Sequence, residues 1–478
     1  MRLSTTRRSF LKRSVLAGSA TLVTPGTRAE GANSDLRVAA IGVRTRGRQL
    51  IDDLLSTPAT RLVSVCDVDP EVLEGEVARL AGKNIKVASY ADFRTLCEAK
   101  DIDAVVVATP NHTHALIAIT AAVGGKHAYV ETPVSHNVWE GQQMVDAAAA
   151  HGVTIHHGHQ RRCWKAWRDA FNWLGEGPLG KLKLARGICY QLQPSIGRVK
   201  GAQLAPEGLD YDLWCGPRAR SPILRKNFHH DWRWQFPWGN GEIGSGGAHL
   251  LDLCRWALGD PQNMPQSVIS CGNRFGTPDN GDWPNTQLAH FEYQAAPILI
   301  ELRGLPKSDL DYPGGSDRHR GISNGVSIAY EGGSLIGELD ETTCRVLDDQ
   351  GRVLKRFEGG GSPIREWITA IQSGRETSTL SISNGHLSDS LAHLANISWM
   401  LGRTMPDHVP IEDRVMLEAF GRMKAHLKTN GIEPERSPIA IGPRLEPKPD
   451  GSAFKGKIKG RADSLLTEPY RDEFKLPL

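Results

Sequence analysis

The sequence lacks paired cysteines, a long apolar run beyond its N-terminal region, and a strong excess of either charge. Its eight cysteines are scattered without a CxxC pair, and several sit inside apolar runs, as Cys66 does in LVSVCD. We interpret them as buried small hydrophobic residues, in preference to a disulfide framework or a zinc site. A formal net charge of +3 argues against a nucleic-acid partner and against a strongly acidic one. After the N-terminal region no segment offers the roughly 20 apolar residues that span a bilayer, so we predict no membrane anchor.

The first residues of the chain carry a targeting pattern. Residues 6–12, TRRSFLK, form a twin-arginine signature, and a mildly apolar run follows at 15–23. Small residues near Ala29 suit cleavage, and Ser19 stands where a lipid anchor would need cysteine. The pattern predicts a signal peptide over residues 1–29 and a periplasmic or otherwise exported protein, against the alternative of a basic amphipathic end.

From residue 36 to about 157, short apolar runs alternate with segments of helical periodicity. Such alternation predicts α/β architecture with a doubly wound parallel sheet. The strands are predicted at 36–42, 61–66, 87–88, 104–108, 128–130 and 153–155. The helices are predicted at 49–55, 71–80, 92–98, 114–123 and 139–151.

The first predicted strand leads into a turn with the spacing of a dinucleotide fingerprint. The turn reads GVRTRG, with Gly42 and Gly47 in place but Arg44 where the middle glycine belongs. Arg44 either pushes a cofactor outward or contributes its own charge to a pyrophosphate, and Arg46 follows it in the same turn. Asp67 ends the second strand about twenty residues later, where a carboxylate takes ribose hydroxyls. The alternative for Asp67 is a plain turn residue, but together these residues predict NAD as cofactor, with NADP less favoured.

The stretch 103–133 predicts one βαβ unit whose polar loops share the carboxyl edge of the sheet. Ligands bind at that edge in open α/β sheets. The predicted cofactor-edge residues of this stretch are Thr109, Pro110, Asn111, His114 and Glu131. The alternative is an ordinary crossover whose histidines lie on surface loops.

Histidines also cluster after the last predicted strand, at 156, 157 and 159. Adjacent strand positions point to opposite faces, so we predict polar residues lining a cleft and no metal ion. Gln160 and Arg161 follow in the same run.

The second half predicts a large sheet with one exposed face and helices behind it. Alternation in KLKLARGICYQ is typical of such a sheet. Strands are predicted at 182–191, 267–273, 287–293, 298–303, 326–331 and 334–339, and helices at 248–258, 364–371, 386–401 and 413–427. The Pro- and Lys-rich remainder predicts an extended tail over residues 431–478.

In this order, several motifs resemble the Gfo/Idh/MocA family of NAD(P)-dependent oxidoreductases, including exported members of the glucose–fructose oxidoreductase type. The motifs are TPNHTH, GKHAYVETP, SHNVWEG, GHQRR, FHHDWRW, GNGEIGSGGAHLLDLCRWALG, PNTQ and GHLSDSLAHLANISWMLGR. The resemblance implies an NAD(P)-binding Rossmann domain at 36–157. It also implies an α+β domain at 158–430 for substrate binding and oligomerisation, with a large open, mostly antiparallel sheet. That sheet often serves the family as a subunit interface, so a homo-oligomer is implied as well.

The family's reaction is hydride transfer at a sugar or polyol carbon, and a base must take the hydroxyl proton. The family's Glu-Lys-Pro lysine is replaced here by Thr132, which cannot act as a base near neutral pH. His249 matches the family's second-domain histidine, and Asp252 lies three residues on, on the same helix face, as its predicted orienter. The alternative is that His249 begins a helix and Asp252 pairs with Arg255.

One further departure and one further motif concern substrate. The family's aspartate four residues before the histidine is Ser245 here. FHHDWRW combines flat aromatic rings with hydrogen-bonding groups, as sugar sites do, and we select His230 and Arg233 from it, beside Gln160 and Arg161. The alternative is that its tryptophans are core residues.

These observations predict an NAD(P)-dependent oxidoreductase that acts on a carbohydrate or polyol. The first alternative is a redox-neutral enzyme of the same family, which oxidises a sugar transiently and cleaves a glycoside. The second is a catalytically inert carbohydrate-binding protein, because Arg44 and Thr132 both depart from the family pattern.

Overall fold

Residues 36–157 form a six-stranded parallel sheet and most of the helices that cover it. The computed structural model describes residues 35–276, 278–307, 315–375, 379–404, 411–433 and 436–477. The strand order is β3-β2-β1-β4-β5-β6, and every pair is parallel, so the predicted doubly wound sheet is confirmed. The strands are β1 (Leu36–Ile41), β2 (Thr60–Cys66), β3 (Ala88–Tyr90), β4 (Ala104–Val107), β5 (His127–Val130) and β6 (Ile155–His157).

Both faces of this sheet are buried, which explains the continuous apolar runs of its strands. In β1, Ala39 packs into the core of one face and Val38 into the core of the other. One face is covered by α2 (Thr45–Leu55), α3 (Pro70–Gly82) and α11 (Pro363–Ser373). The other face is covered by α4 (Phe93–Glu98), α5 (His114–Val123) and α6 (Val138–His151).

A nine-stranded sheet carries the second half, in the order β14-β13-β12-β11-β7-β10-β9-β8-β15. Within the described residues only β7 and β10 pair in parallel, so the predicted mostly antiparallel sheet is confirmed. Its strands are β7 (Leu182–Cys189), β8 (Ser267–Asn273), β9 (Thr286–Glu292), β10 (Ile298–Arg303), β11 (Asn324–Tyr330), β12 (Gly333–Glu338), β13 (Thr343–Leu347), β14 (Val353–Glu358) and β15 (Ala440–Ile441). The sequence did not predict β14, because this edge strand is mostly exposed and lacks an apolar run.

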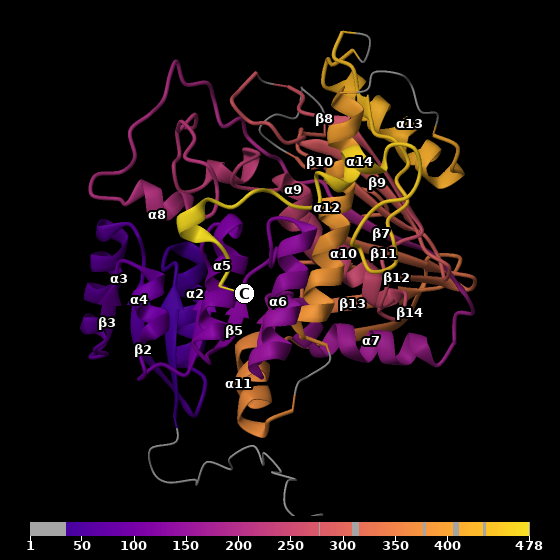
Figure 1. Cartoon of the computed structure of the whole chain (residues 1–478). Helices are drawn as coiled ribbons and strands as arrows, with labels where there is room; N and C mark the ends of the chain where they lie inside the picture. The colour runs from indigo at the N-terminus through magenta and orange to yellow at the C-terminus, as the bar shows by residue number, and fades with distance from the viewer. Residues whose placement is uncertain are drawn as a thin grey trace, which may run out of the picture. The chain divides into compact units, whose positions relative to one another are not determined.

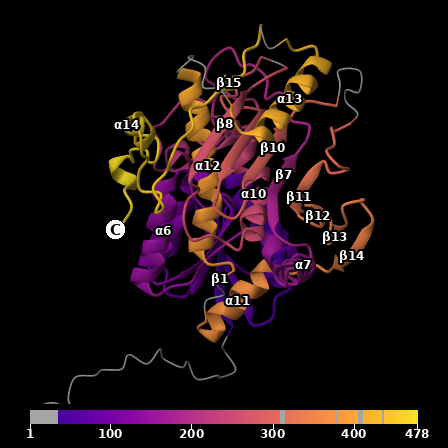
Figure 2. The same cartoon turned by 90° about the vertical axis from the view of Figure 1, so that its right-hand side faces the viewer.

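Helices cover both sides of the second sheet. In β10, Ile298 and Ile300 pack into the core beneath α10 (Gly246–Ala257) and α12 (Ile382–Thr404), while Leu299 packs under α13 (Arg414–Thr429). Helix α12 also contacts α6, so it joins the two sheets (Figures 1 and 2). Helix α10 packs against α12, and its His249 contacts Thr132, which follows β5, so α10 lies near the carboxyl edge of the first sheet.

One of the remaining helices, α7 (Lys165–Gly175), is of ordinary length. The others are short: α8 (Tyr211–Cys215), α9 (Gly241–Gly244) and α14 (Lys459–Asp463). The tail is only partly extended. The segment predicted as an extended tail forms β15 and α14, and it buries Phe454, Leu466 and Phe474.

All eight cysteines are buried and unpaired, as predicted from their apolar surroundings. Over the described part of the chain, no cluster of three or more His, Cys, Asp or Glu side chains suits a metal ion. Within the same residues, no helix combines the length and the apolar character that crossing a membrane requires.

Candidate active site

The turn after β1 brings the backbone close to the neighbouring strand end. Gly42 has φ +81°, and a Cβ there would lie 2.7 Å from the carbonyl carbon of Ala108. A Cβ on Gly47 would lie 1.8 Å from the carbonyl oxygen of Gly42. Both fingerprint glycines are therefore required by geometry. Helix α2 begins at Thr45, between them, so Gly47 lies in its first turn and the free N–H groups of that turn lie at the sheet edge.

Asp67 lies at the end of β2, beside this turn. Its Oδ2 accepts a hydrogen bond from the Val43 N–H at 3.0 Å, and its Oδ1 accepts one from the Asp69 N–H at 3.1 Å. Burial raises the pKa of the Asp67 carboxyl, and these backbone hydrogen bonds oppose the rise. The carboxylate is thus held in one orientation at the ribose position of the fingerprint.

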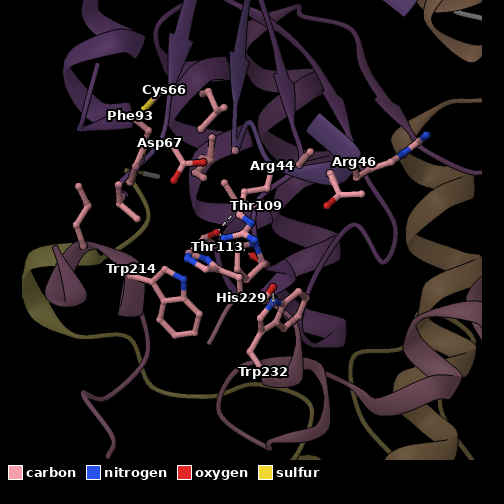
Figure 3. Close-up of a pocket in the computed structure, with 18 of the residues that line it drawn as sticks. Arg44, Arg46, Cys66, Asp67, Phe93, Thr109, Thr113, Trp214, His229 and Trp232 are labelled. Atoms are coloured by element: carbon pink, nitrogen blue, oxygen red, sulfur yellow. Dashed lines mark hydrogen bonds between the residues drawn. The ribbon is translucent and has the colours of Figure 1, made fainter. Parts of the chain in front are cut away.

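A cavity of about 410 Å³, here called the first cavity, opens in front of the turn. Asp67 and Arg44 line it from the parallel sheet, while Trp214, His229 and Trp232 line it from the segment between β7 and α9 (Figure 3). Its apolar wall is formed by Val68, Phe93, Ile117 and Leu213. A glycine turn, a helix N-terminus, a ribose-type carboxylate and an apolar wall together fit an adenine dinucleotide. Arg44 supplies positive charge where the middle glycine is missing.

A second cavity of about 250 Å³ adjoins the first and shares Arg46, Thr109 and Trp232 with it. This second cavity reaches the ends of β4 and β5 and the start of α10. The predicted residues that line it are Arg46, Thr109, Asn111, His114, Glu131, Thr132, His230 and Arg233, and Ser245 lines it too. Pro110 lines the first cavity instead.

Two of the predicted cofactor residues pair with each other, and a third braces the edge loops. Arg46 Nη2 lies 2.8 Å from Glu131 Oε1, and although burial acts to lower the pKa of Arg46, the Glu131 carboxylate raises it. The His114 ring lies between two carbonyl oxygens, 2.8 Å from that of Pro133 and 2.7 Å from that of Thr109. It therefore ties the loop after β4 to the loop after β5.

Thr132 lines the second cavity and contacts His249, which does not itself line that cavity. Thr132 Oγ1 lies 3.3 Å from His249 Nε2, and the residues are brought together from β5 and α10. Burial lowers the pKa of His249 well below its ordinary value, and the charges of Arg161 and His159 lower it further. His249 is therefore a neutral imidazole near pH 7 and has the chemistry of a proton acceptor.

Asp252, which the sequence predicted to orient His249, pairs with other residues instead, so that prediction was wrong. Asp252 Oδ1 lies 2.8 Å from Arg162 Nη2 and accepts a 2.7 Å hydrogen bond from Ser388 Oγ. No described hydrogen bond joins Asp252 to His249 or to Arg255. Its position on the helix does place Asp252 near His249. Its ion-pair partner, however, is Arg162, which comes from another part of the chain.

The predicted substrate residues divide into two groups. His230 and Arg233 line the second cavity, and Arg233 Nη2 donates to Gln193 Oε1 at 3.0 Å. Gln160 and Arg161 line neither cavity. Arg161 donates to the Leu339 carbonyl oxygen at 2.8 Å and acts on the site through its charge on His249.

Sequence reasoning missed several cavity residues from the second half. His229 Nε2 lies 2.9 Å from Asp69 Oδ2, so the loop after α8 is fastened to the parallel sheet. Asn111 donates to Asn240 Oδ1 at 2.6 Å and makes a second link of this kind. His229 stands in the FHHDWRW motif, but its neighbours His230 and Arg233 were chosen, because the pattern does not reveal which side chains face the parallel sheet.

The fold and the two cavities define a dinucleotide-binding α/β protein whose second domain closes one side of the cofactor edge. The model of the oxidoreductase family with an NAD-binding Rossmann fold, Gfo/Idh/MocA, matches residues 36–159, and that of the family's C-terminal alpha/beta domain matches residues 187–299. Residues 36–159 and 187–299 thus match the two domains of this family, and residues 36–159 form an NAD-binding Rossmann domain.

Curated relatives match only part of the chain. A glycosyl hydrolase family 109 protein of Shewanella sp. (strain W3-18-1) is 34% identical over 118 residues, which are 24% of this chain and 26% of that protein. Levoglucosan dehydrogenase of Pseudarthrobacter phenanthrenivorans is 27% identical over 197 residues, or 41% of this chain and 42% of that enzyme. The matches thus span from about a quarter to less than half of these relatives.

Solved structures share the fold over most of the chain. The WlbA dehydrogenase from Bordetella pertussis, in complex with NADH and UDP-GlcNAcA, has a TM-score of 0.55 at 19% identity, covering 79% of this chain and 100% of its own. GenD2 from gentamicin A biosynthesis, in complex with NAD, has a TM-score of 0.56 at 18% identity, covering 80% and 97%. At such identities the likeness concerns the fold alone.

Proposed function

We propose that the protein is an NAD-dependent oxidoreductase that removes hydride from a carbinol carbon of a carbohydrate or polyol. The observation that carries this proposal is the contact of His249 with Thr132, which lines a cavity that adjoins the dinucleotide cavity. The nicotinamide ring, when bound, accepts the hydride. The names of the relatives, which include a levoglucosan dehydrogenase, support a sugar as substrate.

In this proposal the chain's own residues handle the proton. A substrate hydroxyl in the second cavity donates to Thr132 Oγ1, whose own proton passes to His249 Nε2, 3.3 Å away. Oxidation of the carbinol then leaves a carbonyl product and a proton on His249. Thr132 is thus a proton relay rather than a base. Together with His249 it takes the place of the lysine in the family's Glu-Lys-Pro motif. Arg233 and His230 are placed to bind further hydroxyl groups.

A redox-neutral glycoside-cleaving enzyme is the second candidate, and one observation favours it. Trp214, His229 and Trp232 cover the first cavity from the segment between β7 and α9, which suits a nucleotide that stays bound between turnovers. The glycosyl hydrolase family 109 names among the relatives point to the same chemistry.

The deciding experiment is to purify the protein and measure bound nicotinamide by absorbance and by the mass of the released ligand. A sugar that reduces the cofactor supports the oxidoreductase. A glycoside that is split while the cofactor returns to NAD supports the redox-neutral enzyme. A protein that neither carries nor takes up nucleotide would contradict both enzyme functions and would leave an inert carbohydrate-binding protein as the remaining alternative.

We also propose export by the twin-arginine route, supported by residues 6–12. Replacing Arg7 and Arg8 together with lysine is expected to retain the protein in the cytoplasm, as measured by cell fractionation. The matched control is Lys12→Arg, which keeps the arginine pair. Export that is unchanged in the double variant would contradict the proposal.

A further inference from the structure

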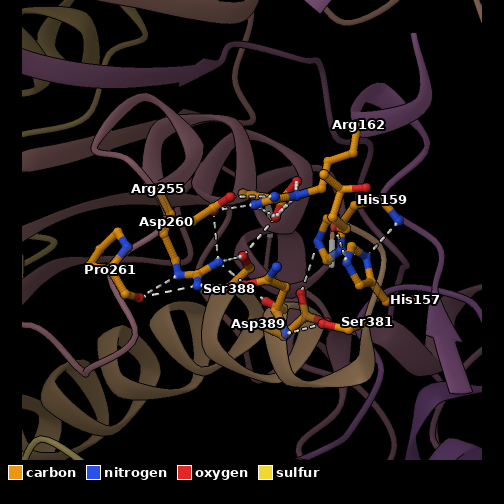
Figure 4. A network of polar contacts seen from close by, with 12 residues as sticks. His157, His159, Arg162, Arg255, Asp260, Pro261, Ser381, Ser388 and Asp389 are labelled. Atoms are coloured by element: carbon orange, nitrogen blue, oxygen red, sulfur yellow. Dashed lines mark hydrogen bonds and ion pairs between the residues drawn. The ribbon is translucent and has the colours of Figure 1, made fainter. Parts of the chain in front are cut away.

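Behind the second cavity, a buried network of charged side chains surrounds His159 (Figure 4). His157 ends β6 and His159 follows it, His249 lies on α10, and Asp389 lies on α12. The His159 and His249 rings meet edge to face with their centroids 5.5 Å apart. The network therefore contacts the proposed base, His249, directly through the His159 ring.

Hydrogen bonding fixes the proton positions on His157. Its Nε2 lies 3.3 Å from the Thr379 carbonyl oxygen, which can only accept, so this nitrogen carries a proton. Its Nδ1 accepts the backbone N–H of His159 at 3.3 Å, so that nitrogen presents a lone pair. Both contacts assign the same neutral tautomer to His157.

This tautomer determines both nitrogens of His159. His159 Nδ1 lies 2.9 Å from the His157 Nδ1 lone pair and must donate to it. His159 Nε2 lies 3.2 Å from Asp389 Oδ1, a carboxylate oxygen whose partner oxygen already accepts the Val134 N–H at 2.7 Å. Within the described residues neither His159 Nε2 nor Asp389 Oδ1 has another hydrogen-bond partner, so a proton on Nε2 that faces the carboxylate at ion-pair distance satisfies both atoms. With Nδ1 also a donor, His159 is a cation.

Charge balance gives the same result independently. The linked ionic side chains, apart from His159, are Arg162, Arg255, Asp252, Asp260 and Asp389. Two cations face three carboxylates, so a neutral His159 would leave one negative charge uncompensated beside 0% exposed groups such as Arg162 and Asp389. Because an unpaired buried charge is strongly unfavourable, an imidazolium at His159 completes the network.

We propose that His159 is a positioning residue held permanently as an imidazolium, and that its charge keeps His249 in the neutral form that accepts the substrate's proton. The role of His159 in catalysis rests on the proposed function, whereas its charge state does not. The substrate class it fits is a carbinol whose hydroxyl must be deprotonated, since a cation beneath the site also favours the developing alkoxide.

The other charged groups around both histidines act in known directions. At His159, burial lowers the pKa, Asp252 and Asp389 raise it, and Arg162 lowers it, with a raised pKa as the result. At His249, Arg161 and Arg46 lower the pKa together with His159, while Asp252 raises it. Loss of the His159 charge therefore raises the pKa of His249, and more of this residue is protonated at neutral pH.

The direct test is the protonation state of His159 in the whole protein, read by NMR of protein labelled with ¹⁵N-histidine. His159→Gln assigns the signal, and His151→Gln, at the exposed end of α6, is the matched control. We expect both ring nitrogens of His159 to be protonated from pH 6 to pH 9. One bare nitrogen at pH 7 would overturn the proposal. If His159→Gln does not fold, a neutron structure of the unchanged protein gives the same reading.

The second test is the pH profile of kcat/KM. The base is active when deprotonated, so the acid limb of the profile follows the pKa of His249, and His159→Gln is expected to move that limb upward by about one pH unit. His159→Gln with Asp389→Asn, which removes both charges, is expected to move it less. An unmoved limb in an active, folded His159→Gln enzyme contradicts the role, whereas the absence of any oxidation contradicts the proposed function and leaves the NMR result standing.

Discussion

Thr132 is the residue on which the proposed chemistry depends most. Its hydroxyl stands between the second cavity and His249. A hydroxyl can pass a proton in both directions, but only when a base lies within reach. The contact with His249 therefore lets Thr132, which departs from the family pattern, pass a proton from the substrate to a base.

Thr132→Val is expected to lower kcat/KM roughly 100-fold, because it removes the link between substrate and base. Thr132→Ser keeps the hydroxyl and is expected to retain most of the activity. Steady-state kinetics with any sugar that proves to be oxidised gives the measurement, and NAD affinity serves as the control. Equal activity of the valine and serine variants would contradict the relay.

Asp67 decides the choice of nucleotide at the same scale. Asp67→Ala is expected to weaken NAD binding roughly tenfold, since a charged hydrogen-bond acceptor for the ribose is lost. The same change is expected to narrow the preference for NAD over NADP, because the carboxylate that repels a 2′-phosphate is gone. Calorimetric titration with both nucleotides tests this, and a preference that stays unchanged would speak against this role for Asp67.

At the scale of elements, the segment from α8 to α9 forms an aromatic cover over the first cavity. The ring of Trp214 packs on Trp238 and Phe228, and the guanidinium of Arg225 lies 4.4 Å from the Phe228 ring centroid. His112 from the parallel sheet enters this cover, with its ring centroid 5.0 Å from Trp214 and its Nε2 2.9 Å from the Trp214 carbonyl oxygen. The cover is thus anchored to the domain that it covers.

His112 predicts a pH dependence of this anchoring. Burial lowers the pKa of His112 from 6.5 to about 3, so the folded protein holds it neutral while the unfolded chain binds a proton below pH 6.5. Its contribution to the free energy of unfolding is therefore lost as the pH falls from 6.5 toward 3.

Urea unfolding of the protein and of His112→Gln at pH 7 and pH 4.5 measures this effect. The difference in unfolding free energy between the two proteins is expected to change by about 2 kcal/mol, in favour of the variant at the lower pH. A difference that stays constant over this range would show that His112 is not held neutral.

At the scale of the whole molecule, the C-terminal segment returns to the cofactor domain. Figure 1 shows it passing α8 on its way to the end of the chain beside the parallel sheet. Arg471 donates to the Gly216 carbonyl oxygen at 2.9 Å, and Tyr470 donates to Glu140 Oε1 at 2.8 Å. Phe474 lies in the same apolar cluster as Phe93 and Leu213, which line the first cavity.

Phe474→Ala is expected to lower the free energy of unfolding by about 3 kcal/mol, because it leaves a void behind this wall. We also expect weaker NAD binding, since Phe93 and Leu213 lose their support. Denaturant titration and NAD titration give the two measurements. The matched control is Leu204→Ala, at a side chain that is 94% exposed, and equal effects of the two changes would contradict the role of the segment.

The sequence by itself determined the parallel sheet, the glycine turn and the position of Asp67. Each of these follows from local rules: doubly buried strands are apolar throughout, Gly42 needs a positive φ, and Asp67 directly follows the last residue of β2. The boundaries of α5, β8 and β10 were predicted to the residue for the same reason. The edge strand β14 was missed because exposure removes the apolar signal.

Only the tertiary structure decided which side chains meet at the site. Asp252 and His249 share a helix, yet Asp252 pairs with Arg162, 90 residues away, and His159 finds its carboxylate in Asp389 on α12. Burial favours whichever pairing leaves no charge unpaired, and the candidates for that pairing arrive from distant strands and helices. The spacing of residues along the chain does not reveal these distant partners. His249 was therefore predicted from the sequence, and the charged network around His159 was not.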